Sequence, residues 1–220
     1  MKKRISIIMA AIFAISLLLM PVSSNAYAPT SDPIIINNNT IILGYRGSYG
    51  IYHCNLVMKK RIKKVTSSDE SMQAFKDGKK GLVIDGYKNG KIKLTCTIQY
   101  TDHTTETFTI KPVKTEIPVK YVKLGSVKFI FKNNLGKYTY KKLNGTQKLK
   151  IKPKKNWIVT GVQQATEPKY LPKNLKSYKK IKTNKKKMGT LYIFMYNKKT
   201  GVNTILNIDY NCRKNDFMPY

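Results

Sequence analysis

The sequence is poor in the residues on which most enzymes depend for acid–base, nucleophilic or metal chemistry. Its 220 residues include two histidines, His53 and His103, three cysteines, and 11 aspartates and glutamates. It contains no Gly-x-Ser-x-Gly, His-Glu-x-x-His or Cys-x-x-Cys pattern, the common signatures of serine hydrolases, zinc proteases and cysteine metal sites. We therefore predict a non-enzymatic protein with no catalytic residue, no cofactor and no metal site. A triad assembled from distant residues stays open, and loss of an activity on replacing either histidine would reveal it.

Asp102, His103 and Glu106 lie close together around a polar turn that begins at Thr101. They could meet a cation there, but a calcium site needs six to eight oxygen ligands and this spacing matches no common ligand pattern. Turn chemistry explains these residues better.

Long apolar runs are also scarce, with one exception at the start of the chain. The run from Ile5 to Met20 follows three basic residues and precedes Pro21 and the small-residue pattern that ends at Ala26. This is typical of a secretory signal peptide, so we predict that residues 1–26 are removed. An uncleaved anchor is the alternative, but the run is short for a bilayer span. We expect no membrane span in the mature chain and a secreted, extracellular location, either free or associated with the cell wall.

Acidic residues are greatly outnumbered by 42 lysines and arginines, which give a formal net charge of +31. Between residues 27 and 117 there are 14 basic and 8 acidic residues, whereas from Pro118 onward there are 25 and 3. Such a field attracts polyanions and is screened over about 8 Å at physiological ionic strength. The alternative is that the lysines only keep a β-rich surface soluble.

The composition and the spacing of turns predict an all-β protein. Residues 92–100 alternate between apolar and polar side chains, as a half-buried strand does. The proline-containing segment 111–118 leaves no room for a helix, so we place a domain boundary there. The fold class we predict is two immunoglobulin-like β-sandwich domains after the signal peptide, at residues 35–113 and 118–212.

The second predicted domain carries two clusters of lysine. In the first cluster, alternate lysines flank Leu149 and Ile151, so one side of a strand projects ammonium groups while the other packs. Residues 163–187, which hold the second cluster, are predicted to form a long basic loop, and a short irregular strand within it is the alternative. Trp157 is expected in the core. The predicted polyanion-binding residues are Lys148, Lys150, Lys152, Lys154, Lys155, Lys179, Lys180, Lys182, Lys185, Lys186 and Lys187.

Three stretches of the first half resemble a bacterial immunoglobulin-like domain of the group 2 type. They are Ile62–Ser71, with its Ser-Ser-Asp turn, Phe75–Leu82, with a central glycine, and Asn89–Cys96, with a Gly-x-Ile-x-Leu-Thr strand. The resemblance covers roughly residues 35–113. It implies a β-sandwich in a secreted surface protein of the Gram-positive kind, acting as a spacer, an adhesion module or a wall-associated module without catalytic residues.

Cys54 and Cys96 are expected to point into the same core, because each alternates with apolar residues on its strand. A disulfide between the two sheets is natural in an exported sandwich. The alternative is two buried thiols, since cysteine packs as a small hydrophobic side chain.

Tyrosines are abundant, with 15 in the chain. The strand predicted at 191–196 is apolar or aromatic on both faces, which favours burial on both sides. The alternative is an exposed aromatic face that stacks on sugars or bases, and Tyr138 and Tyr140 repeat the combination of aromatic rings with neighbouring lysines.

These observations predict a binding module whose basic surface associates with an anionic cell-envelope polymer of the teichoic-acid kind, an acidic glycan or, without sequence preference, extracellular nucleic acid. The alternative is an adhesion or protein-recognition module that binds a specific surface protein through its sheet edges and loops. Salt separates the two, because specific apolar contacts persist when charges are screened.

Overall fold

The computed structural model describes residues 34–45, 51–70, 72–87, 94–168, 173–175 and 178–213. Every regular element within these ranges is a strand, which confirms the all-β prediction, and none of them contains a helix able to cross a membrane. The predicted signal peptide lies outside the described residues. The strands are β1 (Thr40–Tyr45), β2 (Ile51–Val57), β3 (Ile62–Ser67), β4 (Met72–Asp77), β5 (Gly81–Tyr87), β6 (Leu94–Tyr100), β7 (Thr105–Lys114), β8 (Val119–Leu124), β9 (Val127–Phe129), β10 (Gly136–Tyr138), β11 (Gly145–Pro153), β12 (Trp157–Thr166), β13 (Lys173–Asn174), β14 (Lys180–Thr183), β15 (Gly189–Asn197) and β16 (Asn203–Tyr210).

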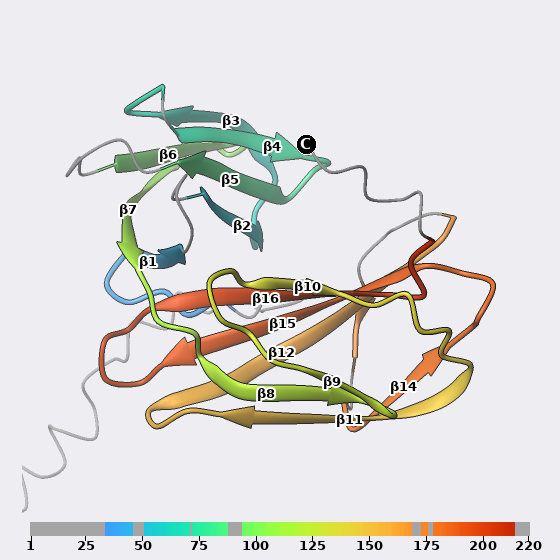
Figure 1. The fold of residues 1–220 in the computed structure, drawn as a ribbon. Coiled ribbons are helices and arrows are strands. Elements are labelled where there is room, and N and C mark those ends of the chain that lie inside the picture. Colours follow the sequence, from blue (N-terminus) through green and yellow to red (C-terminus); the bar gives the residue numbers. More distant parts are fainter. Residues whose placement is uncertain are drawn as a thin grey trace, which may run out of the picture.

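The strands form three sheets (Figure 1). The largest has the order β13-β12-β15-β16-β1-β7-β6-β3, and β10 also pairs with β16. A four-stranded sheet, β14-β11-β8-β9, lies over one part of it, and a three-stranded sheet, β2-β5-β4, lies over the other. The arrangement is therefore sandwich-like, with a large sheet common to both halves.

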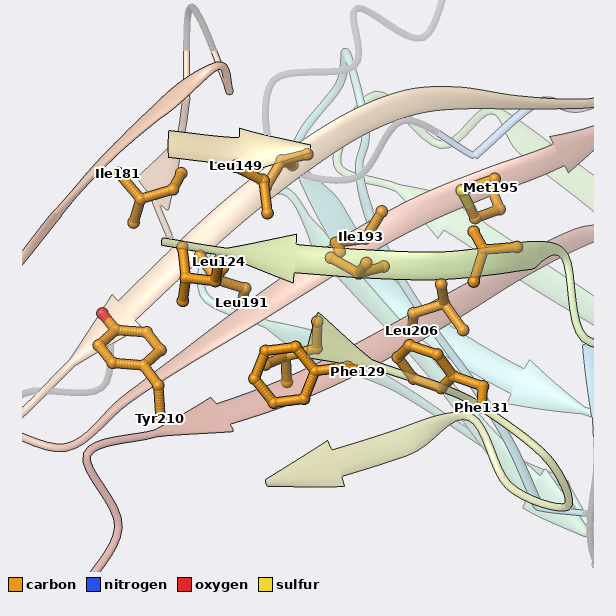
Figure 2. Packing of buried hydrophobic residues seen from close by; sticks show 14 of the residues in the cluster. Leu124, Phe129, Phe131, Leu149, Ile181, Leu191, Ile193, Met195, Leu206 and Tyr210 are labelled. Carbon is orange, nitrogen blue, oxygen red and sulfur yellow. The ribbon is translucent and has the colours of Figure 1, made fainter. Parts of the chain in front are cut away.

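Two hydrophobic clusters fill the space between the layers. The buried members of the first run from Ile41 to Ile110, and those of the second run from Ile117 to Tyr210, so the clusters divide at the segment 111–118. Figure 2 shows the second cluster, to which the four-stranded sheet contributes Leu149 and the large sheet contributes Leu191. The sole tryptophan, Trp157, belongs to this cluster with 4% of its surface exposed, as expected, and its Nε1 donates to a Glu116 oxygen at 2.9 Å.

Strand alternation was a good guide to several of these elements. The strands predicted at 92–100 and 191–196 occur as β6 and β15. The long basic loop predicted at 163–187 is wrong in part, because β12 continues to Thr166, whereas β14 fits the alternative of a short strand within this stretch. In β14, Ile181 and Thr183 are buried and alternate with exposed lysines. Over only four residues this alternation cannot be distinguished in the sequence from a run of charged residues in a loop.

The predicted disulfide between Cys54 and Cys96 is not formed. Both side chains are buried in the first cluster, so the direction in which they point is confirmed. Cys54 is on β2 and Cys96 is on β6, and these strands belong to different sheets. An alternation pattern does not specify how far along its strand each residue lies relative to the other sheet. A disulfide forms only when the two cysteines are closely aligned. Burial raises the pKa of the Cys96 thiol to about 12, which keeps it protonated and unreactive.

The cysteines should accordingly be protected thiols. We expect the native protein to react slowly with a thiol reagent at mildly alkaline pH and the urea-unfolded protein to release all three thiols without a reductant. Quantitative thiol titration in both states measures this. Finding a single thiol after unfolding would instead establish the disulfide.

Strand β1 connects the two halves through hydrogen bonds on both of its edges. It runs parallel to β7 over six residue pairs and touches β16 in parallel at Leu43 and Asn203 (Figure 1). The Asn203 side chain, 1% exposed, accepts from Ile35 N at 2.8 Å and donates to the oxygens of Ile35 and Ile42 at 2.9 and 3.3 Å. One amide therefore satisfies backbone groups of the strand and of the residues before it.

Replacing Asn203 by leucine should destabilise the protein by about 2–3 kcal/mol, because buried backbone groups would lose their partners. Urea unfolding measures the change. Asn207→Leu is the matched control on the same strand, where the side chain is exposed and the effect should be small. Equal losses in the two variants would refute this role of Asn203.

Candidate functional site

The candidate site is built on β11, which alternates lysine with apolar residues. Lys148, Lys150 and Lys152 are exposed, whereas Leu149 is buried and Ile151 packs against the second cluster. The strand thus projects its ammonium groups to solvent and anchors itself through the opposite face, as its sequence predicts.

Pairing between β11 and β14 brings the two predicted lysine clusters together. Lys148 lies directly opposite Lys180, and Lys182 lies opposite Thr146. The backbone N–H of Leu149 donates to the Lys179 oxygen at 2.9 Å, which extends the pairing by one residue. Clusters about thirty residues apart in sequence are therefore parts of one surface.

Strands β8 and β9 add two lysines that sequence reasoning missed. Lys123 lies opposite Lys150 on one side and opposite Lys128 on the other, so three lysines form a row across three strands. The sequence does contain the pattern of these two strands, because apolar and polar residues alternate over residues 119–129 on both sides of a turn at Gly125, which has φ 57°. This pattern was overlooked because these lysines are not clustered in the sequence.

We call this surface the lysine face. Its members all lie on the outward side of the four-stranded sheet: Lys123, Lys128, Lys148, Lys150, Lys152, Lys180 and Lys182.

The lysine face carries uncompensated positive charge. No aspartate or glutamate occurs on β8, β9, β11 or β14. Lysines that lie directly opposite one another in a sheet repel and destabilise it. Tyr121, opposite Lys152, is the aromatic member of this surface, and the Lys128 Nζ lies 4.9 Å from the centre of its ring. The surface can therefore hold anions by charge and offers one ring for stacking.

The remaining predicted lysines flank this surface. Lys154 lies 3.7 Å from a Glu116 oxygen, so its charge is partly compensated. Lys155 is exposed in the turn after β11, and Lys179 is exposed at the start of β14. Lys185, Lys186 and Lys187 are exposed in the loop that joins β14 to β15.

A buried asparagine holds that loop in place. The Asn211 side chain, in a residue with φ 58°, donates to the oxygens of Leu143, Asn184 and Lys187 at 3.0, 2.8 and 3.2 Å. The N–H of Lys185 also donates to the Asn144 Oδ1 at 3.3 Å. The loop lysines are thus fixed beside the start of β11, which lowers the entropy lost when they bind a ligand.

The polar turn of the first half has a different character. Lys60 lies 2.8 Å from an Asp102 oxygen, and hydrogen bonds from Lys60 and Thr104 lower the pKa of Asp102 to about 2. His103 occupies a left-handed turn position with φ 66°. A hollow of about 520 Å³ lies nearby, lined by residues that include Tyr100 and Glu106. Within the described residues no group of three His, Cys, Asp or Glu side chains is arranged to hold a metal.

Comparison with known proteins gives only distant structural likenesses. No family model and no curated protein matches the sequence. Among solved structures, the fibronectin(III)-like modules of Clostridium thermocellum CbhA are 12% identical, with 85% of this chain and 98% of that chain covered and a TM-score of 0.22. The titin domains z1z2 in complex with telethonin are 10% identical, with 78% and 90% covered and a TM-score of 0.21. Superpositions this poor carry no inference about function.

The repulsion within the lysine face can be measured. Replacing Lys123 by glutamate converts two repulsive cross-strand pairs into attractive ones and should stabilise the protein by about 0.5–1.5 kcal/mol at low salt. The gain should shrink at high salt. Urea unfolding at two salt concentrations tests this.

The matched control is Lys64→Glu, because Lys64 is exposed but lies opposite Gln99 rather than a lysine. It makes the same change in net charge without altering a lysine pair. Equal stabilisation by both variants would attribute the effect to net charge alone and refute the local repulsion.

Proposed function

We propose that this protein is a non-enzymatic binding module whose lysine face associates with an anionic polymer of the cell envelope. The observation that supports this most directly is the row of Lys150, Lys123 and Lys128, where like charges lie side by side with no acidic residue on their strands. A bound anion would relieve a repulsion that the folded protein otherwise sustains.

The geometry suits an extended ligand. Neighbouring strands lie about 4.8 Å apart, and alternate residues along one strand lie about 6.7 Å apart. The lysines consequently form a two-dimensional lattice of charges, which a chain of repeated phosphates or carboxylates can follow. Lysine is a flexible point charge, so this surface recognises charge density rather than a particular shape.

The sequence supports an extracellular ligand. The predicted signal peptide and the resemblance of residues 35–113 to group 2 bacterial immunoglobulin-like domains favour a secreted, wall-associated protein. The polyanions available there are teichoic-acid-like polymers, acidic glycans and extracellular nucleic acid. A single aromatic ring, Tyr121, gives little basis for reading bases, so binding to nucleic acid would be nonspecific.

The first experiment is sedimentation of the chain from Tyr27 to Tyr220 with purified cell walls, before and after their anionic polymers are removed, over a series of salt concentrations. We expect binding that falls steeply with salt and is lost from stripped walls. Binding that resists salt, or no binding, would refute the proposal and favour recognition of a specific protein partner.

Variants then test whether the lysine face is the contact. Lys148→Gln, Lys150→Gln and Lys182→Gln together should weaken binding and reduce the slope of log affinity against log salt by about 2, because each phosphate contact contributes about 0.7–0.9. The control combines Lys63→Gln, Lys64→Gln and Lys76→Gln, which removes three exposed lysines from the first half. The same slope change in both triple variants would show that net charge, not this surface, determines binding.

A further inference from the structure

A second surface lies on the opposite side of the same sandwich, over β10, β16 and β15. Residues that are paired across a sheet point to the same face. Tyr138 of β10 pairs with Asp209, which pairs with Thr190 of β15. Because Ile208 and Tyr210 point into the core, the Asp209 side chain points away from it.

The next row of the same face leaves an open space. Gly136 pairs with Asn207, which pairs with Tyr192. A Cβ added at Gly136 would meet no atom within 4 Å. No side chain covers the backbone at Gly136, so this row is open beside Tyr138 and the polar side chain of Asn207.

Tyr138 presents an aromatic surface beside this open position. Its side chain is 52% exposed, and its ring forms an edge-to-face pair with Tyr140, 40% exposed, at a centroid distance of 5.3 Å. Such a pair holds each ring in one orientation. Exposed and fixed aromatic rings are suited to stacking on a flat apolar surface of a ligand.

Asp209 places a partly buried carboxylate on this surface. Its carboxylate is partly buried and accepts from the Thr190 hydroxyl at 2.6 Å. Within the described part of the chain no cation lies within ion-pair distance of it, although basic residues outnumber acidic ones 42 to 11. Burial raises the pKa of Asp209, and burial together with the nearby charge of Asp209 raises the pKa of Tyr192. A partly desolvated acceptor of this kind favours a ligand that can donate hydrogen bonds.

We propose that Tyr138, Gly136 and Asp209 form a binding site for a neutral sugar, one pyranose face stacking on Tyr138 and its hydroxyls donating to Asp209. Asn207 supplies a further donor and acceptor at the edge. Three strands span about 10 Å, which accommodates one or two sugar rings. The combination of one stacking ring with few polar groups is what small-molecule sites use to fix orientation.

Charge decides between a sugar and the other ligand that an aromatic ring and a carboxylate could hold, an organic cation. The chain has a net charge of +31, and such a field repels cations while leaving neutral sugars unaffected. The site is also independent of the lysine face, which points away from the other side of the core.

The test is saturation-transfer NMR of the chain from Tyr27 to Tyr220 with three neutral oligosaccharides, the hexamers of glucose, N-acetylglucosamine and mannose. We expect transfer to at least one hexamer, with affinity that is independent of salt. Tyr138→Ala should lower that affinity about tenfold, the amount that stacking on one ring contributes. Gly136→Val, which adds a side chain in the open space, should also lower it. Asp209→Asn should also weaken binding, because it removes one acceptor atom.

Phe75→Ala is the control, because it removes an aromatic side chain that is equally exposed but lies in the first half. Urea midpoints of all variants separate loss of binding from loss of folding. No transfer to any of the three hexamers, or transfer that the site variants leave unchanged, would refute the site. Binding of tetramethylammonium that is lost in Asp209→Asn, without binding of sugars, would assign it to a cation instead.

Discussion

Strand β1 is hydrogen-bonded on both edges, and the rest of the architecture depends on this arrangement. It pairs with β7 in the half that contains the first cluster, and the Asn203 side chain bonds it to β16 in the half that contains the second. Among the described residues, the segment 111–118 is the other connection between the halves. With β1 in place, one sheet extends through both, and Ile42 of β1 and Val113 of β7 pack against the second cluster. The large sheet is thereby a rigid base for the four-stranded sheet that carries the lysines.

Burial of apolar side chains beneath the lysine face offsets the repulsion among its lysines. Each repulsive lysine pair costs about 0.2–1 kcal/mol, and the outward side of this sheet contains three such pairs. The inward side buries Val122, Leu124, Leu149 and Ile181, each of which contributes about 1.5–3 kcal/mol. Burial therefore exceeds repulsion by several kcal/mol. A sheet with a polar inward side could not carry this charge pattern.

The sequence was sufficient to predict the direction of many side chains but not their neighbours. Alternation correctly assigned the exposed lysines of β11 and the burial of Cys54 and Cys96. It could not predict that β11 pairs with both β14 and β8, because partners and register depend on contacts between distant segments. Alternation indicates the outward direction of Lys123 and Lys128, but it could not place them beside Lys150. The predicted disulfide is wrong for a similar reason, because two cysteines that point into the same core need not be close enough to bond. The expectation that β15 is covered on both faces agrees with Phe194, which is 2% exposed, but Tyr192 and Tyr196 on the same face are only half-buried.

The two proposed surfaces lie on opposite sides of one sandwich, which has a physical consequence. Packed sheets are about 10 Å apart, and side chains on both outer faces increase the separation. A ligand on the lysine face therefore does not reach Asp209, and the two ligands need not compete. A wall polymer that offers both anionic groups and neutral sugars could then be bound at two points. Since the second contact is intramolecular, its effective concentration is high, and two weak sites can retain the protein where neither would alone.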